Sequence, residues 1–432
     1  MKPFSWLSAC VIAGCLAGGP VRAQPATFPQ SPQANASASG LASGPIAGAA
    51  IGAVTLRDAL DAAWKRSVSA RETDGRRRRA EADRATAGSF WAAPPSLELS
   101  HRDDRLQGNA GKRDTAIGVS VPLWLTGQRV ARAATAEAAV SQAQAAEQVA
   151  RLRLAGELRE AAWHVAALQA EAAQSDSQVQ ALMLLADDVE RRVRAGDSAR
   201  ADALAAKAEQ LAASALQLGV RQRLQTARAR WTLLTGLTAA PDLRAAIPAD
   251  GAPAAAAAHP ELQLASRSTA LARQRVDLMR HSRRDAPELT VGVRQDVGGR
   301  GVPSQGSMVV GLRLPFGTDD RNQPLEAAAV AELDVAETQE QRLRESLDSD
   351  AAAARDALHS VQSQLDAETT RAGLLRERAT LIDKSFRAGE TPLPDLLRAL
   401  SAAALADSTA ARQTAALGLA RARLQQTLGL PP

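Results

Sequence analysis

The chain repeats itself at a constant offset. Residues 194–197, Arg-Ala-Gly-Asp, return at 387–390 as Arg-Ala-Gly-Glu, and 387 − 194 = 193. The strand-like stretch 117–123 returns at 310–316 with the same offset. An offset shared by helix-like and strand-like segments indicates that one structural unit was duplicated whole. Each unit is predicted to hold a hairpin, a very long helix, a glycine-containing turn and a second long helix.

Composition divides the chain around these two units. A short apolar run followed by a small-residue cleavage site after Ala23 is typical of a secretory signal, and a stretch rich in Ala, Ser, Pro, Gln and Gly predicts a flexible arm. The stretch 237–260, with four prolines and an alanine run, predicts a linker between the repeats. The expected segments are a signal peptide at 1–23, the arm at 24–53, the first repeat at 54–237, the linker at 238–258 and the second repeat at 259–432.

Both cysteines fall within the predicted signal peptide. Cleavage after Ala23 removes Cys10 and Cys15 and leaves a mature chain with neither thiol nor disulfide. The alternative is a bacterial lipoprotein box at residues 12–15, which would retain Cys15 as a lipidated N-terminus.

Four short segments carry apolar side chains at alternate positions. Each is about nine residues long, the length of a tilted strand that crosses a bilayer. Apolar residues that alternate with small or charged ones are typical of a barrel with a lipid face and a wet lumen; a soluble sandwich sheet is the alternative. Polar loops at 105–114 and 297–306 are predicted to join the strands in pairs. The alternating residues are Leu97, Leu99; Ile117, Val119, Val121, Leu123; Leu289, Val291, Val293; and Met308, Val310, Leu312, Leu314.

Four strands are too few to close a membrane barrel, because every backbone polar group in lipid needs a partner and the smallest such barrels need about eight strands. The predicted fold is therefore an α+β membrane protein that must oligomerise, and a trimer would supply 4 × 3 = 12 strands. Aromatic residues that flank the strands are expected at one membrane interface: Phe90, Trp91, Trp124 and Phe316.

The predicted helices are longer than those of a globular domain. Residues 126–193 contain no proline, so the helix is expected to reach roughly 100 Å at about 1.5 Å per residue. A second such helix is predicted at 324–388, with Pro324 near its first turn, where proline is tolerated. Returning helices are predicted at 198–235 and 392–428, with Ala and Leu seams that favour close antiparallel packing.

The sequence predicts no enzyme. The five histidines lack the spacing of a metal site, and no Walker A loop or Rossmann fingerprint is present, so no catalytic residue, metal or cofactor is expected. The net charge is +5, and the basic run 76–79 is interpreted as a solvated helix face with nearby acids, which gives no reason to expect nucleic acid.

With these features the chain resembles the TolC-like outer-membrane efflux factor family from residue 54 onward. It departs from the family at 67–68, where Ser-Val replaces the usual Asn-Pro. The resemblance implies a homotrimer with a 12-stranded β-barrel in the outer membrane, continued by a long α-helical barrel through the periplasm. It also implies a periplasmic adaptor and an inner-membrane pump of the resistance-nodulation-division type as partners. It rests on the duplicated architecture, the Arg-x-Gly turns, residues 259–262 (His-Pro-Glu-Leu) and residues 428–430 (Leu-Gly-Leu).

Residues 320–323, Asp-Arg-Asn-Gln, resemble the branch of the family that exports cobalt, zinc, cadmium and related cations. Metal cations are therefore the expected cargo of a passive export duct. The alternatives are a duct for type I protein secretion or drug efflux, and a periplasmic coiled-coil scaffold without a pore.

Two groups of residues are expected to carry the mechanism. The resemblance implies that the turns at Arg194, Gly196, Arg387 and Gly389 form the periplasmic tips that meet the adaptor. It also implies that acids just beyond the tips ring a closed aperture, which predicts a gate at Asp395 and Arg398, with Asp202 as the repeat equivalent of Asp395. For Asp202, an ordinary acid at a helix start remains open as an alternative.

Overall fold

The computed structural model describes residues 54–106, 108–239, 243, 259–316 and 319–432. The predicted signal peptide, the arm and most of the linker lie outside these residues. In the part of the chain that the structure describes, no helix has a long enough apolar stretch to cross a membrane.

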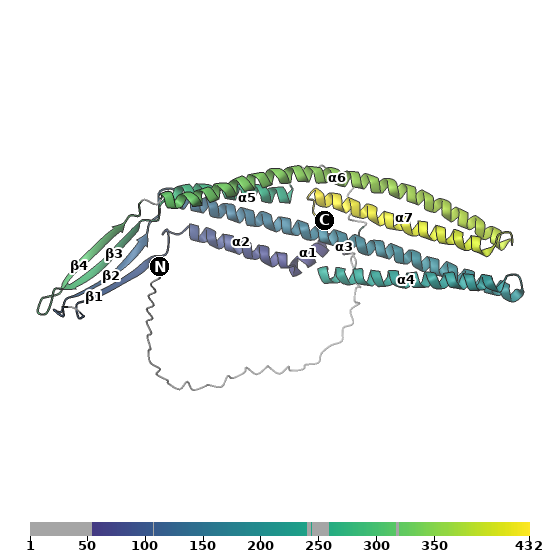
Figure 1. The fold of residues 1–432 in the computed structure, drawn as a ribbon, viewed down its shortest axis with the longest axis horizontal. Coiled ribbons are helices and arrows are strands. Elements are labelled where there is room, and N and C mark those ends of the chain that lie inside the picture. Colours follow the sequence, from purple (N-terminus) through teal and green to yellow (C-terminus); the bar gives the residue numbers. More distant parts are fainter. Residues whose placement is uncertain (1–53, 107, 240–242, 244–258, 317–318) are drawn as a thin grey trace, which may run out of the picture. The chain divides into compact units, whose positions relative to one another are not determined.

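From α2 onward, the order of helix, β-hairpin, long helix and returning helix occurs twice (Figure 1). The first series is α1 (Leu56–Arg66), α2 (Val68–Ala87), β1 (Ser96–Asp103), β2 (Arg113–Pro122), α3 (Gln128–Ala195) and α4 (Arg200–Thr235). The second is α5 (Pro260–His281), β3 (Glu288–Val297), β4 (Gln305–Arg313), α6 (Asp319–Arg387) and α7 (Leu393–Thr427).

The strands form one 4-stranded antiparallel sheet in the order β1-β2-β3-β4. One face is apolar and is left exposed by the described chain: the exposed fraction is 70% for Leu99, 62% for Val293 and 75% for Met308. The other face is polar, and Arg294 binds both carboxylate oxygens of Asp114 across β2 and β3. The two-faced alternation predicted from the sequence is thus present.

Aromatic side chains gather where β1 begins and β2 ends. The indole N–H of Trp124 donates to the carbonyl of Phe90 at 3.0 Å. The rings of Phe90 and Trp91 meet edge to face, with centres 4.7 Å apart. These residues therefore mark one end of the sheet, as expected from their positions in the hairpin.

Helices α3 and α6 are 68 and 69 residues long, and α4 and α7 fold back along them as the returning helices. Helix α3 also contacts α2, α5 and α7, so it joins the two series. The largest buried cluster lies where α1 packs against α3 and α4, around the fully buried Trp231. Small residues such as Ala59, Ala63 and Ala162 line this contact and allow the close approach of the helices.

Helices α1 and α2 are separated at Ser67, where the family that the chain resembles has Asn-Pro. Ser67 is extended, with φ −72° and ψ 144°, and its hydroxyl accepts from the N–H of Ala70 at 3.1 Å. Serine is a good N-cap because its oxygen satisfies an N–H that has no partner within the helix. The serine therefore starts α2 without the proline.

The start of the second long helix was predicted wrongly. Helix α6 begins at Asp319, so Pro324 lies inside it and not at its first turns. A proline this near a helix start deprives only one early carbonyl of its partner. The five residues before it therefore remain helical.

The basic run in α2 is a solvated helix face, as predicted. Arg77 and Arg78 each bind Asp74 at 2.7 Å, and Arg76 binds Glu72 at 2.5 Å. These exposed pairs at helical spacing satisfy one another, which leaves no concentrated positive patch on this face.

Candidate functional site

Two glycine turns end the long helices, and both have the same backbone geometry. Gly196 has φ 88° and Gly389 has φ 82°, a left-handed conformation that glycine adopts without steric cost. Asp197 N–H donates to the carbonyl of Arg192 at 2.9 Å, and Glu390 N–H donates to that of Ser385 at 3.0 Å. Each turn thus donates a hydrogen bond to a carbonyl in the last turns of its helix.

A single buried cluster holds the two turns beside one another. It contains residues from all four long helices, including Val189 of α3, Ala206 of α4, Phe386 of α6 and Leu396 of α7. Val189 and Leu396 are fully buried. The guanidinium of Arg192 lies 4.9 Å from the ring centre of Phe386 and so links the last turn of α3 to that of α6. The tips of the two repeats therefore form one structural unit.

The two arginines of the repeated turn differ in their contacts. Arg387 binds Asp383, one helical turn earlier, at 2.9 Å, and its side chain is 71% exposed. Arg194 is exposed and makes no ion pair within the described part of the chain. Both guanidinium groups lie at the surface, where they are available to carboxylates or carbonyls of another protein.

Asp395 and Arg398 form an ion pair in the first turns of α7. Nη2 of Arg398 lies 3.0 Å from Oδ1 of Asp395, and the exposed side-chain fractions are 78% and 45% respectively. Leu396 and Leu397, between them in sequence, are buried in the cluster at the tip. The pair therefore lies on the face of α7 that is turned away from the chain's own core.

Asp202, the repeat equivalent of Asp395, has a different role in the structure. Its Oδ2 accepts from the N–H of Ala199 at 3.3 Å and so caps the start of α4. At the equivalent place before Asp395 stands Pro392, the N-cap of α7, and proline has no N–H to donate. Asp395 is therefore free to bind Arg398, whereas the carboxylate of Asp202 is engaged in the cap.

Two polar features were not singled out from the sequence. Arg159 is 2% exposed and donates to Oε1 of Gln426 and, at 2.8 Å, to the carbonyl of Leu430; burial lowers its pKa to about 10. The contact of Arg192 with Phe386 was also missed. In both contacts the partners lie close to 200 positions apart in the sequence, or further apart. Local sequence patterns give no signal for contacts of this kind.

The acidic and histidine side chains of the described residues do not form a metal site. Among them, no three His, Cys, Asp or Glu side chains lie close enough to hold a metal ion. His259 serves as the N-cap of α5, where its Nδ1 accepts from the N–H of Glu261 at 3.2 Å. What the site offers is a paired helix tip with exposed arginines, and an exposed ion pair beside it.

Comparison with known proteins gives a family match in the first repeat and a shared fold over most of the chain. Residues 57–237 match the sequence profile of the outer membrane efflux protein family. A search of curated proteins found no match.

Solved structures share the fold at low sequence identity. The outer membrane protein VceC of Vibrio cholerae has a TM-score of 0.69 at 16% identity, over 87% of this chain and 96% of its own. CusC, described with transmembrane channel formation, has a TM-score of 0.73 at 14% identity, over 87% and 92%. The MtrE outer membrane channel of Neisseria gonorrhoeae, in its open state, has a TM-score of 0.66 at 17% identity, over 88% and 89%.

Proposed function

We propose that this chain, a member of the TolC-like outer membrane efflux protein family with its family match at residues 57–237, is one subunit of a passive trimeric export duct. The protein belongs in the outer membrane of a Gram-negative cell, with its long helices in the periplasm. Three duplicated chains supply a 12-stranded barrel that continues as a helical barrel. The duct receives its cargo from a periplasmic adaptor and an inner-membrane pump of the resistance-nodulation-division type.

The observation that carries this proposal is the exposed apolar face of the sheet. Side chains of this face such as Val119, Val293 and Met308 are 45%, 62% and 75% exposed in the described chain, and such a continuous apolar surface needs lipid or protein against it. Strands β1 and β4 form the two edges of the sheet. In a bilayer those edges require partners, which further copies of the same sheet provide.

The number of subunits is tested by crosslinking the purified protein in detergent. We expect the ladder of crosslinked species to end at three subunits. A stable detergent-solubilised monomer, or a protein that stays in solution without detergent, would instead favour the scaffold without a pore.

The tips and the ion pair are given roles in this duct. Arg194, Gly196, Arg387 and Gly389 form the surface that meets the adaptor, supported by the exposure of both arginines and by the cluster that joins the turns. Asp395 and Arg398 line the closed aperture at the tip, where three copies would meet around the three-fold axis. Opening then separates these copies as the adaptor pulls the tips apart.

Metal cations are the cargo that we propose for the duct. Support comes from the likeness of residues 320–323 to the cation branch, and from an exposed carboxylate at Asp395, because rings of acids attract cations. A deletion strain tested against a panel of metals and drugs separates the possibilities. Sensitivity to metals alone supports the proposal, and sensitivity to drugs alone, or loss of a secreted protein, assigns the duct to the alternative systems.

A further inference from the structure

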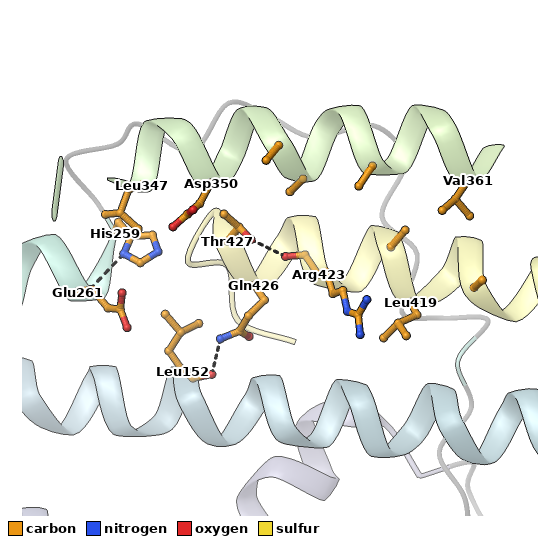
Figure 2. Close-up of a pocket in the computed structure, with 15 residues that line it drawn as sticks. Leu152, His259, Glu261, Leu347, Asp350, Val361, Leu419, Arg423, Gln426 and Thr427 are labelled. Carbon is orange, nitrogen blue, oxygen red and sulfur yellow. Dashed lines mark hydrogen bonds between the residues drawn. The ribbon is translucent and has the colours of Figure 1, made fainter. Parts of the chain in front are cut away.

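A groove of about 610 Å³ opens beneath the middle of α6, between the start of α5 and the end of α7 (Figure 2). Its walls come from α6, α7, α5 and one residue of α3, Leu152. Most of the lining is Ala, Leu and Val, including Leu347, Ala354 and Val361 on α6. The groove is thus a largely apolar surface on α6, between the start of α5 and the last turns of α7.

The polar side chains that line this groove each have a partner in the described part of the chain, including Glu261 with Arg153 and Asp350 with Ser346. Nε2 of Gln426 donates to the carbonyl of Leu152 at 2.8 Å, and Arg423 binds both oxygens of Glu160. His259 Nδ1 accepts from the N–H of Glu261, as Figure 2 shows. A polar ligand would find few unengaged donors or acceptors here, so the chemistry favours an apolar peptide.

The first repeat has an equivalent surface on α3, and there α1 covers it. Leu347, Ala354 and Val361 lie 193 residues after Leu154, Ala161 and Leu168 of α3 (347 − 154 = 193). Leu154 and Leu168 are buried at 7% and 5% exposure, in the cluster that α1 completes with its own side chains.

The two repeats differ in how deeply these equivalent residues are buried in the described chain. Leu347, Ala354 and Val361 of the groove are only half-buried, unlike their counterparts under α1. The groove on α6 therefore corresponds to the surface of α3 that α1 covers in the first repeat.

The position of α1 in the sequence identifies the occupant. Helix α1 ends immediately before Ser67, the N-cap of α2, and Ser67 corresponds to His259, the N-cap of α5 (259 − 67 = 192). The residues that correspond to α1 are therefore 248–258, which hold the alanine run 254–258. They lead directly into His259, and His259 itself lines the groove.

The other end of this segment is also placed. Leu243 packs against the cluster under α1, so the chain leaves the first repeat's core at Leu243 and re-enters at the rim of the groove at His259. Fifteen residues, 244–258, lie between these points. We propose that the groove beneath α6 binds residues 248–258 of the same chain, as the second-repeat counterpart of the contact between α1 and α3.

The proposal concerns one chain and does not depend on what the duct exports. It is tested by disulfide trapping in the full-length protein with Cys10 and Cys15 replaced by serine. Ala255→Cys is paired with Ala354→Cys in the groove, and the control pairs it with Ala352→Cys, an exposed residue of α6 outside the groove lining. Oxidation should give an intrachain disulfide, identified by peptide mass spectrometry, at least several-fold more readily in the first pair.

A second measurement uses the groove cysteine alone. Ala354→Cys should react slowly with a maleimide, and at least several-fold faster when residues 252–258 are replaced by a Gly-Ser sequence of equal length. Equal trapping in the two cysteine pairs, or equal maleimide rates in the two chains, would overturn the proposal. A disulfide between chains would also overturn it, because the occupant would then be a second copy.

Discussion

The guanidinium of Arg192 in α3 lies 4.9 Å from the ring centre of Phe386 in α6, so each repeat contributes one member of a contact between the two tips. Phe386 is only 8% exposed and belongs to the cluster shared by all four long helices. The two turns are therefore expected to gain or lose order together. Binding of an adaptor at one turn would then also change the order of the other turn.

Phe386→Ala should loosen both tips. Truncating a buried phenylalanine costs about 3–5 kcal/mol, and the stacked arginine adds about 0.5–1 kcal/mol at a partly exposed site. Hydrogen exchange is expected to accelerate in residues 185–200 as well as in 380–396. Phe386→Leu, which retains most of the apolar volume, serves as the matched control with a smaller effect. Faster exchange confined to 380–396 would show that the turns are independent.

Asp202→Ala and Asp395→Ala should have opposite consequences. Removing Asp202 takes away the acceptor for Ala199 N–H and should cost about 0.5–2 kcal/mol of stability, as for other cap residues, with channel conductance unchanged. Removing Asp395 should leave stability nearly unchanged, because its pair with Arg398 is exposed. It should raise single-channel conductance in planar bilayers and weaken block by multivalent cations.

The cause of this difference is Pro392, which stands where the first repeat has Ala199. Pro392→Ala restores an N–H at the start of α7 and should draw Asp395 away from Arg398 into a cap. Its conductance should therefore shift in the same direction as that of Asp395→Ala. If conductance and cation block are unchanged in both variants, Asp395 is only a helix-start acid and the gate lies elsewhere.

Changes at the second tip should uncouple export while sparing assembly. Gly389→Pro disrupts the left-handed turn, and Arg387→Glu places a like charge beside Asp383, which Arg387 binds in the structure. Both variants are expected to lose resistance to the exported compound at normal levels of membrane-inserted trimer. Gly389→Ala should cost about 1–2 kcal/mol through its backbone alone, because a Cβ there meets no other atom. Normal resistance in Gly389→Pro and Arg387→Glu would remove the turn from the docking surface.

Local sequence patterns were enough to predict the helices and strands. They did not predict contacts between residues that are far apart in the sequence. Alternation at Ile117 and Val119 was enough for the strands, and the glycines at 196 and 389 were enough for the ends of the long helices. The start of α6 was misplaced because Pro324 was treated as a helix start, although helices tolerate proline slightly later. The different fates of Asp202 and Asp395 follow from Ala199 and Pro392, a signal that was present in the sequence.

The buried packing could not be foreseen in the same way. The repeat offset aligns Arg159 with Ala352, so nothing in the repeat indicated a buried arginine. Its partners Gln426 and Leu430 belong to the end of the other repeat. Such contacts depend on how α3 and α7 cross, which hydrophobic periodicity does not determine.

His259 should make the stability of the second repeat depend on pH. Its Nδ1 accepts from the N–H of Glu261 at the start of α5, which requires the unprotonated nitrogen. Burial lowers the pKa of His259 below its ordinary value of 6.5, and the charge of Glu261 together with a hydrogen bond to the backbone of Thr427 opposes this only in part. The unfolded chain therefore binds the proton more readily than the folded one. The stabilising contribution is complete above pH 6.5 and is lost as the pH falls through the folded pKa, with a slope of at most about 1.4 kcal/mol per pH unit.

The test compares melting temperatures between pH 7.5 and pH 5 in detergent. His259→Asn retains an N-cap acceptor without a titrating ring, so its melting temperature should fall less than that of the unmodified protein over this range. His359→Asn removes an exposed histidine of α6 and provides the control, with the pH dependence expected to stay as in the unmodified protein. Should His259→Asn and His359→Asn show the same pH dependence, titration of the α5 cap does not contribute. If only His259→Asn flattens it, protonation of His259 weakens the cap of α5 and so destabilises the fold at low pH.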